Sequence, residues 1–181
     1  LLIGLFLRTV FQFVEPSFNI DEISLGNNIK DLNFKELLYP LENYQSAPPL
    51  YLWLQKSILL ISPFNFWFNI KILSFLASLT SVYLFYKFLI RSYRVDVISV
   101  LVFSIFVFNP FIIYNSLTLK QYGIDLVGVL FLLTYYNHTS FKRYNWLFFM
   151  IWCLISNIGL FGCTGYLLFI FIKQYQNFKL R

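Results

Sequence analysis

Long apolar runs alternate with short polar segments along most of this chain. Residues 67–88 read WFNIKILSFLASLTSVYLFYKF, and residues 96–114 form a second run that ends in FNPFIIY. Because about 20 apolar residues allow a helix to cross a bilayer, each run predicts a membrane-spanning helix. The whole pattern predicts an all-α, polytopic transmembrane protein with about six spans. The other four are expected at Leu1–Val14, Tyr122–Tyr136, Trp146–Leu160 and Thr164–Ile172, with Gly159, Gly162 and Gly165 interrupting the last two.

Residues 50–61, LYLWLQKSILLI, form an apolar run that is too short to cross. As a helix the run measures about 18 Å, against roughly 30 Å of hydrocarbon. Pro48, Pro49 and Pro63 border the run, and proline does not allow a helix to continue through it. The segment therefore predicts an interfacial or re-entrant helix.

The positions of lysine and arginine provide a check on the number of crossings. If residues 50–61 do not cross, the cations between the spans collect on one side, which the positive-inside rule makes cytoplasmic. Residues 15–66 then form a long first external loop, and residues 115–121 a short second one, within a single transmembrane domain over residues 1–181. The cytoplasmic cations are Lys87, Arg91, Arg94, Lys142, Arg143, Lys173, Lys179 and Arg181.

Composition agrees with a membrane protein. Of the 181 residues, 59% are hydrophobic and 12% are charged, whereas soluble domains carry about 25% charged residues. The net charge of +6 does not indicate nucleic-acid binding, because the cations border apolar runs. The chain starts inside an apolar run without Met, so we expect the N-terminal part of a longer protein.

Several residues that often carry chemistry have a simpler interpretation here. Cys153 and Cys163 lie in apolar segments without metal-ligand spacing, which predicts packing residues. His138 is the one histidine and lies in a cytoplasmic loop, so neither a metal site nor a catalytic triad is expected there. Asn137 begins a glycosylation sequon on the same side, where it would not be used.

The first external loop holds six of the eight acidic residues, and two of them are adjacent, Asp21 and Glu22. Asn19 precedes them as a possible N-cap, and carboxylates in a first turn favour a helix. We therefore expect a helix along the membrane surface that starts here. The pair either caps this helix or takes part in chemistry, and the local pattern allows both.

Cations and acids near the second external loop are also candidates. Lys120 lies at the outer surface between Tyr114 and Tyr122. It is either an interface residue whose chain extends to water or a group that holds a phosphate. Asp125, about one turn into the fourth span, is a buried acid, which indicates a functional residue or a partner for Lys120.

The order of these motifs resembles a known family. A first span with Arg8 is followed by the external Asp21-Glu22 pair, by PPLY at residues 48–51, by IK-x-x-S around Lys71, and by S-x-x-x-KQY at residues 116–122. This order resembles the GT-C membrane glycosyltransferases, in particular the bacterial relatives of protein O-mannosyltransferases and of the lipid A aminoarabinose transferase. The resemblance covers nearly the whole chain.

The resemblance implies a role for each matching residue. Asp21 corresponds to the catalytic base, with Glu22 beside it. Lys120 and Tyr122 correspond to the motif that contacts the lipid-linked phosphate. The PPLY residues, including Pro49 and Tyr51, correspond to a segment that shapes the substrate cavity. Arg8 and Lys71 are expected to be structural, and Thr118 stands where relatives often have an acid, which leaves a divalent metal possible but unsupported.

The resemblance also implies an activity. The complete enzyme would move a sugar from a polyprenyl-phosphate donor to a protein, glycan or lipid acceptor, with inversion, on the extracytoplasmic side of the bacterial inner membrane. Its partners would be the donor, the acceptor and membrane lipid, without nucleic acid and without a certain cofactor. The base, Asp21, would accept the acceptor's proton, and Lys120 would stabilise the departing phosphate.

Three other functions remain open from the sequence. An O-antigen-type polymerase would use lipid-linked sugars too, but with its main charges in a later loop. A transporter or flippase would have charged or broken mid-span positions in two repeats, and no repeat is evident. A non-enzymatic membrane subunit is the third alternative. A complete sequence with about a dozen spans and an external C-terminal domain would favour the transferase.

Overall fold

The computed structural model describes residues 2–13, 18–93, 96–135 and 139–179. This part of the chain is helical and contains no β-strand, so the predicted all-α class is confirmed. His138 and the start of the sequon at Asn137 lie outside the described residues. The α-helices are α1 (Leu2–Phe13), α2 (Ile20–Asp31), α3 (Pro49–Ile61), α4 (Phe66–Ser92), α5 (Val97–Phe108), α6 (Pro110–Asn115), α7 (Tyr122–Tyr135), α8 (Thr139–Ile155) and α9 (Asn157–Lys179), and two 3₁₀ turns are η1 (Glu36–Leu38) and η2 (Glu42–Tyr44).

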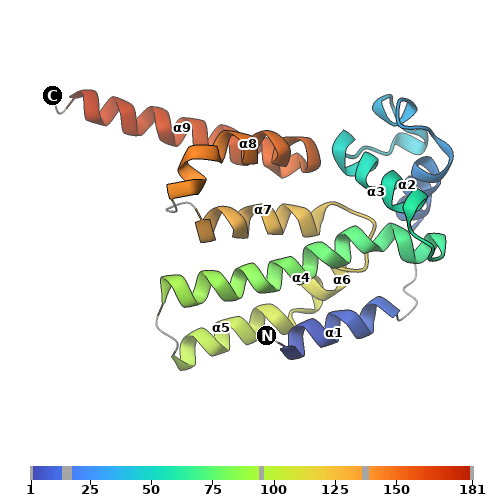
Figure 1. The fold of residues 1–181 in the computed structure, drawn as a ribbon, viewed down its shortest axis with the longest axis horizontal. Helices are drawn as coiled ribbons and strands as arrows, with labels where there is room; N and C mark the ends of the chain where they lie inside the picture. The colour runs from blue at the N-terminus through green and yellow to red at the C-terminus, as the bar shows by residue number, and fades with distance from the viewer. Residues whose placement is uncertain (1, 14–17, 94–95, 136–138, 180–181) are drawn as a thin grey trace.

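The longest helix, α4, is the axis of the arrangement. Helix α7 packs along one side of α4, and α1 and α5 pack along the other (Figure 1). Helices α8 and α9 form a hairpin beyond α7, while α2 and α3 gather at one end of α4 (Figure 1). The segment that the sequence assigns to the first external loop therefore forms a folded unit at one end of the bundle.

Small and polar side chains explain the close contact between α4 and α7. Ser74, Ala77, Ser78 and Ser81 are buried along α4, and a side chain at Gly123 would meet Ala77 Cβ at 3.3 Å. Small residues on both helices allow their backbones to approach, as they do between helices in membranes. This contact fixes the start of α7, and with it the loop that precedes α7.

Of the described helices, α4 is the one that is long and apolar enough to cross a membrane by length and composition. It starts at Asn65, whose side chain accepts a hydrogen bond from the N–H of Phe68 at 2.8 Å, and it contains the predicted span 67–88. Shorter apolar helices are Leu2–Phe13, Pro49–Ile61, Val97–Phe108, Tyr122–Tyr135, and the segments Tyr144–Ile155 and Asn157–Ile172 of α8 and α9.

Two predicted boundaries are wrong. The run at residues 96–114 is not one helix, because the side chain of Asn109 caps a new helix by accepting from the N–H groups of Phe111 and Ile112. The last two segments divide at Ser156 instead of at the glycines. Gly159 and Gly162 lie inside α9, and a Cβ on either would be 2.7 Å or less from an atom of Trp152. The absence of a side chain at these two glycines allows α9 to pack closely against Trp152 of α8.

The unit formed by α2, η1 and α3 has a core of its own that includes the start of α4. Its buried side chains are mostly aliphatic, with Tyr51 among them and Leu119 contributed from the loop before α7. The predicted short helix at residues 50–61 is confirmed as α3, which has 13 residues. Leu119 is the point at which the second predicted loop is anchored in the first. The core residues are Leu25, Ile29, Leu37, Leu41, Tyr51, Leu52, Ile70 and Leu119.

Candidate functional site

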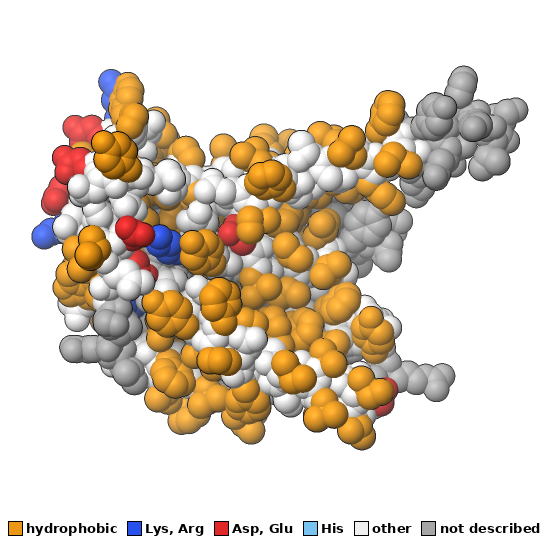
Figure 2. Space-filling view, turned by 180° about the vertical axis from the view of Figure 1, so that it is seen from behind, with side chains coloured by type: hydrophobic (Ala, Val, Ile, Leu, Met, Phe, Trp, Pro, Cys, Tyr) orange, Lys and Arg blue, Asp and Glu red, His pale blue; other side chains and the backbone are white. Residues whose placement is uncertain are grey.

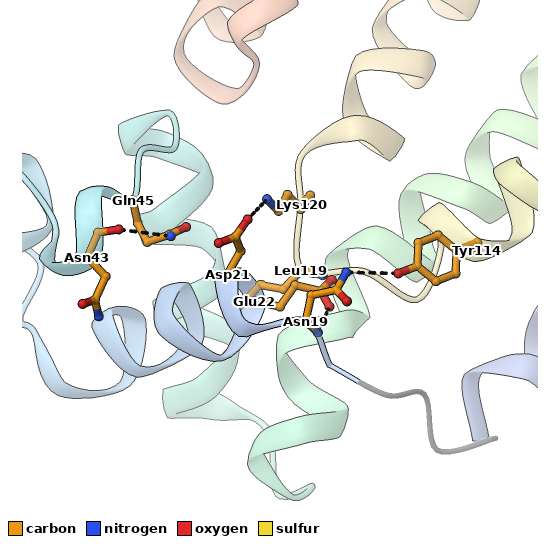
Figure 3. Close-up of polar contacts among 8 residues, drawn as sticks. All are labelled: Asn19, Asp21, Glu22, Asn43, Gln45, Tyr114, Leu119 and Lys120. Atoms are coloured by element: carbon orange, nitrogen blue, oxygen red, sulfur yellow. Dashed lines mark hydrogen bonds and ion pairs between the residues drawn. The ribbon is translucent and has the colours of Figure 1, made fainter.

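Asp21 and Lys120, which are 99 positions apart in the sequence, form an ion pair. Lys120 Nζ lies 3.5 Å from Asp21 Oδ2, and the side chains are 29% and 65% exposed, respectively. The two side chains point toward one another from the first turn of α2 and from the segment before α7 (Figure 3). The two residues that the resemblance pairs in function are therefore neighbours on an accessible surface.

Glu22 is buried and connects the two segments that carry this pair. Its carboxylate is buried, with the residue 2% exposed. Oε1 accepts a hydrogen bond from the N–H of Leu119 at 2.9 Å, and Oε2 accepts one from the N–H of Asn19 at 3.1 Å. One carboxylate thus bonds the start of α2 to the residue next to Lys120. These contacts favour Glu22 as a capping and positioning residue over Glu22 as a group that touches substrate.

Two tyrosines, Tyr114 and Tyr122, flank Lys120 along the chain. The hydroxyl of Tyr114 accepts a hydrogen bond from Asn19 Nδ2 at 3.3 Å (Figure 3). Tyr122 is the first residue of α7, is half exposed, and lines a largely apolar cavity of about 210 Å³ between α4, α6 and α7. Ser78, Ser81 and Ser116 also line this cavity. An apolar cavity with a few hydroxyls therefore adjoins Tyr122, two residues after Lys120.

The PPLY segment contributes one exposed residue and one core residue to the start of α3. Pro49 is exposed in the first turn of α3. Tyr51 has no exposed surface, and its hydroxyl accepts a hydrogen bond from Gln55 Nε2 at 3.1 Å. Burial raises the pKa of the Tyr51 hydroxyl well above its usual range, so the hydroxyl stays protonated. In this structure Tyr51 supports the site from the core.

Arg8 and Lys71, which the sequence assigns to structural roles, are both buried. Arg8 Nε donates to Ser78 Oγ at 2.8 Å, and Nη1 donates to the carbonyl oxygen of Val107 at 3.0 Å. Lys71 Nζ lies 4.3 Å from the centre of the Phe18 ring. Arg8 thus joins α1 to α4 and to the end of α5, which agrees with a structural role.

Asp125 is not the partner of Lys120, and that alternative is wrong. Its carboxylate accepts a hydrogen bond from the hydroxyl of Ser156, at the break between α8 and α9.

Thr118, at the position where relatives often have an acid, is buried and donates its hydroxyl to the carbonyl of Asn115 at 3.2 Å. Within the described ranges, no group of three or more His, Cys, Asp or Glu side chains is placed to hold a metal ion.

Sequence reasoning missed the turn at Asn43 and Tyr44. Both residues have positive φ angles, 56° and 55°, a conformation that costs free energy for residues other than glycine. Asn43 Nδ2 donates to Ser24 Oγ at 2.6 Å, and the Asn28 side chain bonds the backbone of Glu42. Helix α2 therefore fixes this turn. Asn at position 43 is the one local signal, because Asn tolerates this conformation better than most residues.

Comparisons with known proteins add no relative. No protein-family model matches the chain, and no curated protein and no solved structure gives a significant match. The resemblance to the GT-C glycosyltransferases therefore depends on the motifs and on their order along the chain.

The role of Glu22 can be tested by replacing it with Gln. We expect the free energy of unfolding to fall by about 1–3 kcal/mol, because a buried carboxylate that accepts two backbone N–H groups is replaced by a neutral amide. Thermal unfolding of the protein in detergent measures the change. Glu42→Gln, which alters an exposed carboxylate, is the matched control. Equal stability of the two variants would show that the Glu22 contacts do not hold the site.

Proposed function

We propose that this chain is part of a GT-C-type membrane glycosyltransferase that uses a polyprenyl-phosphate sugar as donor. Transfer takes place on the extracytoplasmic side of the bacterial inner membrane. The observation that carries the proposal is the 3.5 Å pair of Asp21 and Lys120. It joins a carboxylate and a cation from the two segments that the positive-inside rule assigns to one side of the membrane.

The distribution of apolar surface supports a membrane location for the bundle. Hydrophobic side chains cover much of the face drawn in Figure 2, and most of the charged side chains visible there gather at the end that carries α2 and α3. In the proposal α4 crosses the membrane, and α1, α5 with α6, α7, α8 and α9 are the other spans. Helices α2 and α3 lie at the outer surface. Exposed apolar side chains such as Ile98, Leu101 and Ile105 on α5 then face lipid.

The chemistry needs only the groups at this site. The acceptor's hydroxyl oxygen attacks the anomeric carbon of the sugar, and Asp21 takes the proton from that hydroxyl. The bond between the anomeric carbon and the phosphate oxygen breaks, and polyprenyl phosphate leaves with the electron pair. Lys120, with Tyr122 beside it, stabilises the negative charge on the departing phosphate. A single displacement inverts the configuration at the anomeric carbon.

The ion pair also suggests how donor binding releases the Asp21 carboxylate so that it can act as the base. Lys120 and Asp21 bind each other when no phosphate is present, and an exposed pair of this kind contributes only about 0–1 kcal/mol. A donor phosphate exchanges for the carboxylate as the partner of Lys120 at little cost. Asp21 then becomes free to accept a proton. Binding of the donor phosphate to Lys120 and release of the Asp21 carboxylate are thus linked.

The proposal is tested by assaying membranes that contain the complete protein with a panel of labelled polyprenyl-phosphate sugars. We expect transfer from at least one donor. In Lys120→Ala the donor concentration for half-maximal rate should rise roughly tenfold or more, because one charge-assisted contact to phosphate is lost. Lys35→Ala, at an exposed position in the first predicted external loop, is the control. Failure of the wild-type protein to use any donor, or unchanged donor saturation in Lys120→Ala, would contradict the proposal.

A further inference from the structure

A second pocket lies at the opposite end of α2 from Asp21. It has a volume of about 280 Å³ and is bounded by the end of α2, by α3 and by the start of α4. Lys30 is nine positions after Asp21, which separates the two along the helix axis by about 14 Å. The pocket is therefore distinct from the proposed transfer site.

Two lysines form the polar side of this pocket. Lys56 Nζ donates a hydrogen bond to the carbonyl oxygen of Lys30 at 2.8 Å, and Lys30 Nζ lies 5.7 Å from the centre of the Phe66 ring. Among the described residues, no acidic side chain lines the pocket or pairs with either lysine. Asn69, which also lines it, is satisfied by bonds to Ser62 and to the backbone of Phe64. The two lysines thus line one pocket that has no acidic side chain in its lining.

This local charge is opposite to that of the surrounding segment. Residues 15–66 contain six acids and three lysines, so the segment is negative as a whole. Two of the three lysines nevertheless line the same pocket. Two cations that line one pocket repel each other, and an anion bound in the pocket is attracted to both.

The rim of the pocket is apolar and exposed. Leu60 and Ile61, the last two residues of α3, and Phe64, in the turn that follows, are 66%, 83% and 60% exposed. The turn comes directly before Phe66, where α4 starts, and Trp67 beside it is partly exposed. Exposed aliphatic and aromatic side chains next to the end of a membrane-spanning helix are typical of the boundary between headgroups and hydrocarbon. The lysines would then be at the level of lipid phosphates.

We propose that this pocket binds the headgroup of an anionic glycerophospholipid. The phosphate diester accepts hydrogen bonds from Lys30 and Lys56, and the acyl chains run past Leu59, Leu60 and Phe64. The inference depends on α4 crossing the membrane, as in the proposed function, but not on the transferase chemistry. A lipid held here fixes the end of α2 against the membrane surface.

Lipid binding to the purified protein tests the proposal. Native mass spectrometry of the protein in detergent measures how much phosphatidylglycerol and phosphatidylcholine are retained as each is titrated. We compare the wild-type protein with Lys30→Gln/Lys56→Gln, which removes both charges and keeps a polar side chain at each position. Lys35→Gln removes a lysine of the same segment from outside the pocket and is the matched control.

We expect the double variant to bind phosphatidylglycerol roughly tenfold or more weakly, because two lysines near the phosphate are lost. Lys35→Gln should bind like the wild-type protein, and millimolar inorganic phosphate should not compete. Equal phosphatidylglycerol binding by the wild-type protein and the double variant would overturn the proposal. So would an equal loss in Lys35→Gln, or displacement of the lipid by inorganic phosphate, which would indicate a site for the free ion.

Two further measurements keep the test decisive. If the double variant does not fold, Lys30→Gln carries the test alone, because Lys30 is exposed and its side chain only approaches Phe66. Each variant is also assayed for sugar transfer. If the double variant loses lipid retention but still transfers sugar, the result supports the lipid pocket whatever the outcome for Asp21. If Asp21→Asn loses transfer but still retains lipid, the two sites are shown to be separate.

Discussion

Asp21→Asn is expected to lower the rate of sugar transfer by roughly 10²–10⁴-fold in the complete protein, the range that a general base contributes. The amide has nearly the same shape as the carboxylate but does not accept the acceptor's proton. The Asp21 side chain is 65% exposed and its ion partner is Lys120. Its removal should therefore change the free energy of unfolding by no more than about 1 kcal/mol. The variant should insert and fold normally.

The measurement is the single-turnover rate with saturating labelled donor, together with thermal unfolding of the same sample. Asp31→Asn is the matched control, because Asp31 is an exposed carboxylate in the last turn of the same helix. We expect the control to transfer sugar at the wild-type rate. An Asp21→Asn variant with nearly wild-type turnover would remove Asp21 from the chemistry, even if the chain proved to be a transferase.

Tyr51→Ala is expected to lower the free energy of unfolding by about 3–5 kcal/mol, the cost of removing a buried aromatic ring from a packed core. Tyr51 has no exposed surface and packs within the core of α2, α3 and the start of α4. Leu119 belongs to the same core, so the loss should also loosen the loop that carries Lys120. Transfer should fall with the folded fraction.

Tyr51→Phe distinguishes packing from contact with substrate. It keeps the ring and removes only the hydroxyl, which accepts a hydrogen bond from Gln55, so we expect a loss of about 1 kcal/mol in stability. Donor saturation should be unchanged. Chemical unfolding and donor titration of both variants provide the comparison. A large rise in the donor requirement of a fully folded Tyr51→Phe would show that the hydroxyl contacts substrate, as the PPLY resemblance implies.

Local signals were enough to predict the elements of the site. Asn19 followed by Asp21 and Glu22 predicted the start of α2, and the prolines around residues 50–61 predicted the limits of α3. Each of these helix boundaries was predicted from residues within about one turn of that boundary. These predictions needed no knowledge of which helices meet.

Contacts between distant segments were not predictable in the same way. Glu22 looked like a cap or a catalytic acid, and its bond to Leu119 depends on how the second loop packs on α2. Asp125 could have paired with Lys120, which is close in sequence, but Ser156 reaches it from the break after α8. The pocket between Lys30 and Lys56 likewise exists only because α3 packs against the end of α2. Hydrophobic pattern and spacing do not determine such partners.

The hydrogen bond between Glu22 and Leu119 has a consequence for biosynthesis, because its two residues are 97 positions apart. At about 5–20 residues per second, a ribosome needs roughly 5–20 s to make the intervening chain. During that interval the nascent α2 exists without the backbone group that finally engages its carboxylate. A truncated translation product that stops before residue 119 contains Glu22 and its local partner Asn19, but lacks the backbone N–H of Leu119.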